Sequence, residues 1–250
     1  IETFHSEYTR NGEPIRINFR KIVTELSSTE RYSHLIHSYP AKLLCHIPYF
    51  FLQTDYFCPE NGVVLDPFCG TGTVMLEANI SGRNAKGADA NPLACLISKV
   101  KTTYIKKDDL QKTLGTIISR AKRFNTNEYI DTSSVSRWFS KSTIMQLWHL
   151  ECAIKKVRNT KHQDFFMMCL SNLVKKVSFA DPSISVPVKL NPERFAQNPE
   201  RMESARFKLK TLENVDVYDK FENICQLNIN RIDSLKDIYF NEITSEVISN

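Results

Sequence analysis

A turn that contains two glycines, between two apolar segments, constrains the fold of this chain more than any other feature. Residues 63–65 are β-branched or apolar and suit a strand that is buried on both faces, and residues 66–73 form the turn. A helix is predicted from the turn to Ile80, since apolar side chains follow at helical spacing, and a second strand is predicted at residues 85–88. The pattern therefore predicts a strand, a loop, a helix and a strand in succession, with Asp89 at the end of the second strand.

This unit is suited to binding a nucleoside. Parallel strands bring their carboxyl ends to one edge of a sheet, where ligands bind. Gly70 and Gly72 allow the backbone to turn sharply and to approach a ligand closely. Asp89 can accept two hydrogen bonds from a ribose diol.

The residues around the turn favour one class of nucleoside. No lysine follows the glycines, as a P-loop requires, and Met75 stands where a dinucleotide motif has its third glycine. Asp66 would repel a phosphate, but it suits a ligand with a cationic amino acid end. S-adenosylmethionine fits this description because it carries an ammonium and a sulfonium group.

Several segments of the chain resemble the amino-methylating DNA methyltransferases, which act on adenine N6 or cytosine N4. Residues 66–73, 87–94 and 97–102 resemble the segments of that family around the glycine turn and the second strand. Residues 37–42, with the sequence HSYPAK, resemble the upstream segment that packs against the cofactor. The resemblance is specific over residues 34–103.

The resemblance implies an α/β fold of the Rossmann-like class I methyltransferase type, with a helical insert between the second and third strands. The predicted domains are an N-terminal arm or strand at residues 1–33, a cofactor-binding core at residues 34–104 and 216–250, and a mainly helical insert at residues 105–215. The insert is a possible DNA-contacting region.

The resemblance also implies that S-adenosylmethionine is the cofactor. Residues 37–42 would lie near its methionine end, although Lys42 can equally be a solvated residue at a helix start. Ala90 and Asn91 would lie beside its adenine, as would a polar residue after the third strand. Asp233 is the first choice for that residue and Asn228 the second. The complete set of predicted cofactor-binding residues is Tyr39, Pro40, Lys42, Asp66, Pro67, Phe68, Cys69, Gly70, Thr71, Gly72, Thr73, Asp89, Ala90, Asn91 and Asp233.

The family's catalytic motif is an Asp, Asn or Ser followed by Pro-Pro and an aromatic residue, at the end of the fourth strand. Its polar groups accept hydrogen bonds from the target amino group, and its aromatic ring stacks on the flipped base. The chain contains no Pro-Pro-aromatic sequence, but Asn250 stands where the motif would begin and would favour adenine N6. The chain is therefore expected to be a fragment, to be completed by a second polypeptide, or to continue beyond residue 250.

The predicted function is methyl transfer from S-adenosylmethionine to an exocyclic amino group of DNA, in a restriction–modification system. One alternative is an RNA methyltransferase that acts on guanine N2 of transfer RNA. The other is a non-catalytic subunit that needs a partner chain.

Composition agrees with a cytoplasmic protein of bacterial type that is associated with the nucleoid when bound to DNA. No apolar run approaches the roughly 18 residues of a membrane span, and no signal peptide is recognised. The 7 cysteines are scattered without a Cys-x-x-Cys pair, which predicts neither a zinc site nor disulfides. The net charge of +5 is compatible with nucleic acid as a partner.

The remaining segments are predicted from their periodicity. Residues 178–199 read as a loop flanked by basic residues, which either contacts DNA or crosses the surface. Helices are predicted at residues 41–53, 108–124, 140–157 and 161–177, and strands at residues 223–229 and 243–248. Residues 14–26 are predicted to form a strand or an arm.

Overall fold

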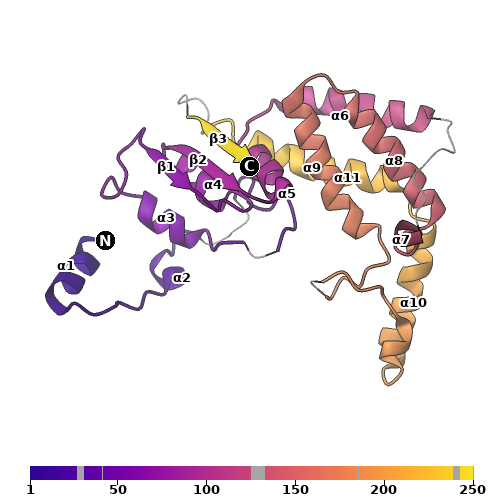
Figure 1. Ribbon diagram of the computed structural model, residues 1–250, viewed down its shortest axis with the longest axis horizontal. Helices are drawn as coiled ribbons and strands as arrows, with labels where there is room; N and C mark the ends of the chain where they lie inside the picture. Colours follow the sequence, from indigo (N-terminus) through magenta and orange to yellow (C-terminus); the bar gives the residue numbers. More distant parts are fainter. Residues whose placement is uncertain (27–30, 41, 125–132, 185, 239–242, 250) are drawn as a thin grey trace. The chain divides into compact units, whose positions relative to one another are not determined.

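The computed structural model describes most of the chain and divides it into two compact units (Figure 1). One unit comprises residues 1–104 and 234–250, and the other comprises residues 105–233. The described residues are 1–26, 31–40, 42–124, 133–184, 186–238 and 243–249.

The first unit is built on a parallel sheet of three strands in the order β1-β2-β3. The strands are β1 (Val63–Asp66), β2 (Asn84–Asp89) and β3 (Ser245–Ser249). Asp66 pairs with Gly87 and Asp89 pairs with Ser249, so all three strands end along the same edge of the sheet.

The predicted succession of strand, loop, helix and strand is confirmed. Helix α4 (Thr73–Ile80) follows the glycine turn and packs on β2, and α5 (Pro92–Lys101) follows β2. Asn91 caps α5 by accepting a hydrogen bond from the Leu93 N–H, which satisfies one of the unpaired donors of the first turn. Met75 on α4 is fully buried, at the position where a dinucleotide motif would require glycine.

The expectation that the first strand is buried on both faces is wrong. Val63 is 56% exposed and Leu65 is 69% exposed, because β1 is an edge strand whose main contacts are with β2 and α4 alone. Phe68, just after β1, is 87% exposed. The apolar character of this strand therefore reflects a surface that the described residues leave uncovered.

The N-terminal part of the first unit holds helices α1 (Glu2–Asn11), α2 (Phe19–Ile22) and α3 (His46–Leu52). The strand predicted at residues 14–26 is wrong, since Asn18 caps α2 by accepting a hydrogen bond from the Lys21 N–H. Helix α3 is shorter than predicted. It begins at His46, which places Pro48 in the first turn, where a missing N–H costs nothing.

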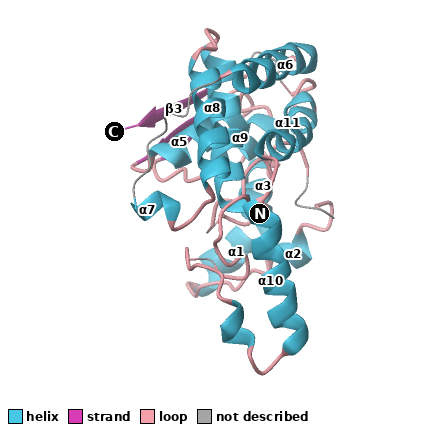
Figure 2. Cartoon of the chain, turned by 90° about the vertical axis from the view of Figure 1, so that its right-hand side faces the viewer, coloured by secondary structure: helices cyan, strands magenta, loops and turns pink. Residues whose placement is uncertain are grey.

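The described part of the second unit contains helices and loops, with one isolated β-bridge between Ala180 and Lys189. Its core is formed by α6, α8, α9 and α11, which pack against one another around Phe165, Phe166 and Phe221 (Figure 2). The helices are α6 (Lys107–Arg123), α7 (Ser133–Ser136), α8 (Lys141–Lys155), α9 (Thr160–Lys176), the 3₁₀ helix η1 (Pro192–Phe195), α10 (Pro199–Glu213) and α11 (Val217–Asp233).

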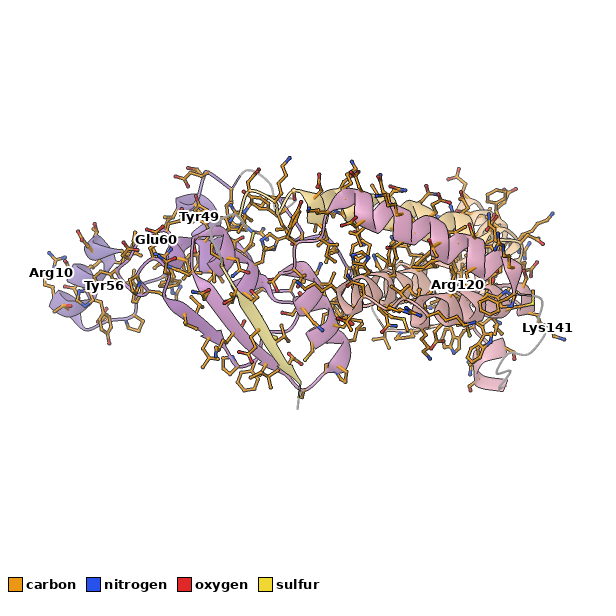
Figure 3. The ribbon with its side chains drawn as sticks, turned by 90° about the horizontal axis from the view of Figure 1, so that it is seen from above. Arg10, Tyr49, Tyr56, Glu60, Arg120 and Lys141 are labelled. Atoms are coloured by element: carbon orange, nitrogen blue, oxygen red, sulfur yellow. The ribbon has the colours of Figure 1, made fainter. Side chains whose placement is uncertain are left out.

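Three of the helices predicted for this region, α6, α8 and α9, are confirmed. The side chains of α6 line the upper edge of the unit in Figure 3, where Arg120 lies on the side of α6 that faces α8. Its guanidinium donates a hydrogen bond of 3.4 Å to the Ala153 carbonyl of α8.

The strand predicted at residues 223–229 is wrong, because these residues lie within α11. Phe221, Cys225, Asn228 and Ile232 are buried at helical spacing, and this packing decides the structure. The segment predicted as a strand at residues 243–248 forms β3, which is thus the third strand along the chain.

Candidate functional site

The glycine turn is anchored to the second strand. The Cys69 N–H donates a 2.9 Å hydrogen bond to the Ala88 carbonyl, and the Gly70 N–H donates a 2.9 Å hydrogen bond to Oδ2 of Asp89. The backbone φ angles of Gly70 and Gly72 are 49° and 70°, in the left-handed region that favours glycine. The turn is therefore fixed to β2 at two points.

The two glycines serve different purposes. A Cβ atom at Gly72 would lie 2.3 Å from Oγ of Ser98, so this glycine allows the turn to pack on α5. A Cβ atom at Gly70 would meet nothing within 4 Å. Gly70 therefore leaves open space beside the turn, whereas Gly72 closes the turn against the protein interior.

The two predicted acids lie at the carboxyl ends of neighbouring strands. Oδ1 of Asp66 accepts a 3.2 Å hydrogen bond from the Phe68 N–H, and Oδ1 of Asp89 accepts a 2.8 Å hydrogen bond from the Asn91 N–H. Burial raises the pKa of Asp66, and the charge of Asp89 raises it further. Each oxygen of Asp89 accepts one hydrogen bond from the described backbone and has a second lone pair for a ligand.

A hollow of about 210 Å³ opens beside the turn. It contains both a cation, Lys42, and a carboxylate, Asp66. A second hollow of about 230 Å³ shares Lys42, Leu43 and Thr73 with the first, and Arg20 and His34 also line it. The residues that line the first hollow are Lys42, Leu43, Asp66, Phe68, Cys69, Gly70, Thr71, Thr73 and Val74.

The segment before α3 is held at this edge of the sheet by polar contacts. The Asn91 side-chain amide donates a 2.9 Å hydrogen bond to the Tyr39 hydroxyl. The Lys42 ammonium donates hydrogen bonds to the carbonyls of His37 and His34. Tyr39 and Lys42 are thereby joined to the same region as Asn91, as the resemblance predicted for the cofactor-binding segment.

A buried carboxylate fixes the beginning of this segment to α4. Glu77 is 1% exposed, forms an ion pair with Arg31, and lies 2.6 Å from Nε2 of His34 in a hydrogen bond. Burial lowers the pKa of His34, although Glu77 opposes this effect. The Arg31 guanidinium also lies over the ring of Tyr49 on α3, 5.0 Å from its centroid.

The structure brings most of the predicted cofactor-binding residues together. Asp89 is joined to the turn by its hydrogen bond to Gly70, and Asn91 and Tyr39 follow from it by further hydrogen bonds, whereas Gly72 packs on Ser98. Pro40, Pro67 and Ala90 are exposed at the surface. Seven of the predicted residues line the hollow: Lys42, Asp66, Phe68, Cys69, Gly70, Thr71 and Thr73.

Two of the predicted site residues need correction. Asp233 is the last residue of α11, so the reason for choosing it, a strand at residues 223–229, is wrong, and the same holds for Asn228. Asn250 lies outside the described residues. Among the strands that the structure describes, β3 is the third along the chain, whereas the assignment of Asn250 placed it after the fourth.

Sequence reasoning missed Arg31, His34, Glu77 and Lys101, which form a charged cluster behind the turn. The available signal was a charged residue at a core-facing position of an otherwise apolar helix, as Glu77 is between Leu76 and Ala78.

Among the described residues, no three His, Cys, Asp or Glu side chains are grouped to bind a metal ion. Of the helices that the structure describes, none is both long and apolar enough to cross a membrane.

Comparison with known proteins supports a family assignment. Residues 26–100 match the family model described as DNA methylase. The type II methyltransferase M.MvaI of Kocuria varians is 27% identical over 211 residues, which make up 79% of this chain and 46% of that protein. The type II methyltransferase M.MjaII of Methanocaldococcus jannaschii is 32% identical over 104 residues, which make up 41% of this chain and 19% of that protein. No solved structure matches the chain.

The chain thus spans less than half the length of both curated relatives. The matched segment contains the turn, both acids and the Glu77 contacts, which are the parts of the site that the structure brings together. The predicted resemblance to the N6/N4 DNA methyltransferases is confirmed over residues 26–100, and the chain is similar to type II methyltransferases over a larger part of its length.

Proposed function

We propose that this chain binds S-adenosylmethionine beside its glycine turn and forms the cofactor-binding part of a DNA methyltransferase of a restriction–modification system. The target is an exocyclic amino group, either N6 of adenine or N4 of cytosine. The observation that carries the proposal is the hollow beside Gly70, because it is lined by one cation, Lys42, and one carboxylate, Asp66.

The charges of the hollow match the amino acid end of this cofactor. Lys42 suits the methionine carboxylate, and Asp66 suits the ammonium group. The open space at Gly70 admits the ligand close to the backbone, and the free lone pairs of Asp89 suit the ribose hydroxyls. When bound, the cofactor supplies an electrophilic methyl group on its sulfonium, and the residues of this chain bind and orient it.

Titration calorimetry with S-adenosylmethionine tests this proposal. Asp89→Ala should lower the affinity at least tenfold, because the ribose loses its acceptor and the Gly70 N–H loses its partner. Asp237→Ala removes an exposed carboxylate of the same unit and should leave the affinity unchanged. Equal affinity of the Asp89 variant and the wild type would refute the ribose assignment, and no binding by the wild type would refute the proposal.

Within the proposed function, the second unit contacts the DNA backbone through a basic hollow. This hollow, of about 320 Å³, lies between the loop before η1 and helix α10, and its cations are Arg201 and Lys208. Arg206, by contrast, forms an ion pair of 2.8 Å with Glu193. Arg201 and Lys208 are therefore suited to contact phosphates, and the Ser204 hydroxyl is suited to donate a hydrogen bond. The Ser183 hydroxyl already donates a 2.6 Å hydrogen bond to Asp181, a carboxylate that also lines this hollow.

The salt dependence of DNA binding tests this surface. Each phosphate contact contributes a slope of roughly −0.9 in a plot of log affinity against log salt concentration. The double variant R201Q/K208Q should therefore reduce the slope by about 2. The variant R206Q removes an exposed cation that is already paired, and it should change the slope less. Competition with transfer RNA tests the alternative function: if the substrate is RNA, transfer RNA should displace DNA from the wild type.

A further inference from the structure

A buried lysine lies directly behind the glycine turn and has no place in the proposed binding of the cofactor. Lys101, the last residue of α5, is 0% exposed. Its ammonium nitrogen lies 3.5 Å from Oγ1 of Thr71, which lines the hollow. The Lys101 carbonyl accepts a 2.7 Å hydrogen bond from the Ser33 hydroxyl, so the residue also joins the turn to the segment that starts at Arg31.

The charged groups around Lys101 come from every element that packs near it. Glu77 of α4 attracts the ammonium form, but Glu77 is already paired with Arg31 and His34. Lys42, which lines the hollow, repels it. The Cys45 thiol at the start of α3 attracts the ammonium form more strongly than Glu77 does when it is ionised, although burial raises the pKa of that thiol.

These surroundings hold the lysine near its titration point at neutral pH. Burial, followed by the charge of Lys42, lowers the pKa of Lys101 to about 7. A buried ammonium group with no carboxylate of its own is costly, so small changes in nearby charge decide its protonation. Among the nearby charged groups, Lys42 has the largest effect on the pKa of Lys101. A ligand can reach Lys42, because Lys42 lines both hollows.

We propose that Lys101 is a positioning residue that couples occupation of the hollow to its own protonation. An anionic group bound beside Lys42 compensates the charge that repels Lys101, and Lys101 then takes up a proton from solvent. The resulting ammonium group donates a tighter hydrogen bond to Thr71 Oγ1 and holds the turn in its binding conformation. This inference rests on the proposed function, since the anionic group is the carboxylate of S-adenosylmethionine.

Proton uptake during binding is the direct test. Calorimetric titration of S-adenosylmethionine at pH 7.5, in buffers of different ionisation enthalpy, gives the number of protons taken up. The amino group of the ligand also titrates in this range, so the number of protons taken up by the wild type is compared with the number taken up by the variant. Lys101→Met should take up less than the wild type by a fraction of one proton. Lys99→Met, which removes an exposed lysine of the same helix, should match the wild type.

The pH dependence of affinity gives the same test by linkage. The affinity of the wild type should fall by up to tenfold per pH unit above pH 7, until the pKa of Lys101 in the bound protein is reached. When the titration of the ligand's amino group is subtracted from both profiles, the affinity of Lys101→Met should not fall with pH in this way. Equal proton uptake and equal pH profiles in both proteins would overturn the coupling while leaving cofactor binding, and thus the proposed function, intact.

A measurement on the wild type alone covers the case in which the variant does not fold. With ¹³C-labelled lysine, one Cε resonance of the free protein should titrate near pH 7, and its midpoint should rise when S-adenosylmethionine is added. A resonance that titrates near pH 7 with the same midpoint in both states would overturn the inference. The absence of any lysine that titrates below pH 9 would overturn it as well.

Discussion

Replacing Lys101 with methionine should stabilise the first unit, and the gain should depend on pH. The side chain is completely buried, and the pKa is lowered from 10.5 to about 7. Since one pKa unit corresponds to about 1.4 kcal/mol, the difference between the folded and unfolded pKa values costs the fold about 5 kcal/mol at pH 7 and below. Methionine keeps the apolar stem and removes the group that must lose its charge.

The sign of the pH dependence follows from the lowered pKa. As the pH falls from 10.5 toward 7, the unfolded chain binds a proton at Lys101 before the folded protein does, so the wild type loses stability. Methionine does not titrate. The advantage of the variant should therefore be largest at pH 7 and below, and it should shrink by about 2 kcal/mol between pH 7 and pH 9. The loss of the contact with Thr71 reduces the advantage by about 1 kcal/mol at every pH.

Urea denaturation at pH 7, 8 and 9, followed by fluorescence, measures this difference. The control is Lys99→Met, which removes an exposed lysine from the same helix and should change the unfolding free energy by less than about 0.5 kcal/mol. A Lys101 variant that is less stable than the wild type, or a difference that is the same at all three pH values, would refute the reasoning.

Three further substitutions test the packing of the site by the same denaturation assay. Gly72→Ala should lower the unfolding free energy by more than about 2 kcal/mol, because its Cβ would lie 2.3 Å from Oγ of Ser98 and the backbone φ is positive. Gly70→Ala should lower it by about 1 kcal/mol, since only the positive φ opposes the change. Equal losses in the two variants would contradict the packing of the turn on α5. Glu77→Gln should lower the unfolding free energy by about 3 kcal/mol, because it removes the carboxylate that compensates Arg31 and accepts from His34. An unchanged unfolding free energy would show that these contacts contribute nothing. Asn91→Ala should cost about 1 kcal/mol through loss of the helix cap, and it should weaken binding of S-adenosylmethionine; a variant as stable as the wild type would contradict the capping role.

The parts of the fold that depend on local signals were predictable from the sequence. The turn at Gly70 and Gly72 requires positive φ angles, and the cap at Asn91 requires only its own first turn, so neither depends on distant residues. The strands on either side of the turn follow from the same pattern. For that reason seven of the predicted residues line one hollow beside the turn, and their role in cofactor binding stays a prediction.

The errors arose where tertiary packing overrides the local pattern. Residues 223–229 alternate enough to resemble a strand, but burial of Phe221, Cys225 and Ile232 against the neighbouring helices makes them part of α11. The exposure of Leu65 depends on which strands pair with β1, and a sequence pattern carries no information about that. Both errors concern partners that are distant along the chain.

The charged cluster behind the turn raises the question of why a protein would place such groups in its interior. An apolar core at the positions of Glu77 and Lys101 would be more stable, because burying a lysine and an ion pair costs more in lost hydration than an apolar side chain does. The cost is concentrated close to the hollow, because Lys101 contacts Thr71 and His34 lines the second hollow. A purely structural role predicts that removing Lys101 weakens both the fold and cofactor binding. A positioning role predicts that removing Lys101 makes the first unit more stable and abolishes the proton uptake that accompanies cofactor binding. The two measurements on Lys101→Met therefore decide between these explanations only when they are made on the same protein.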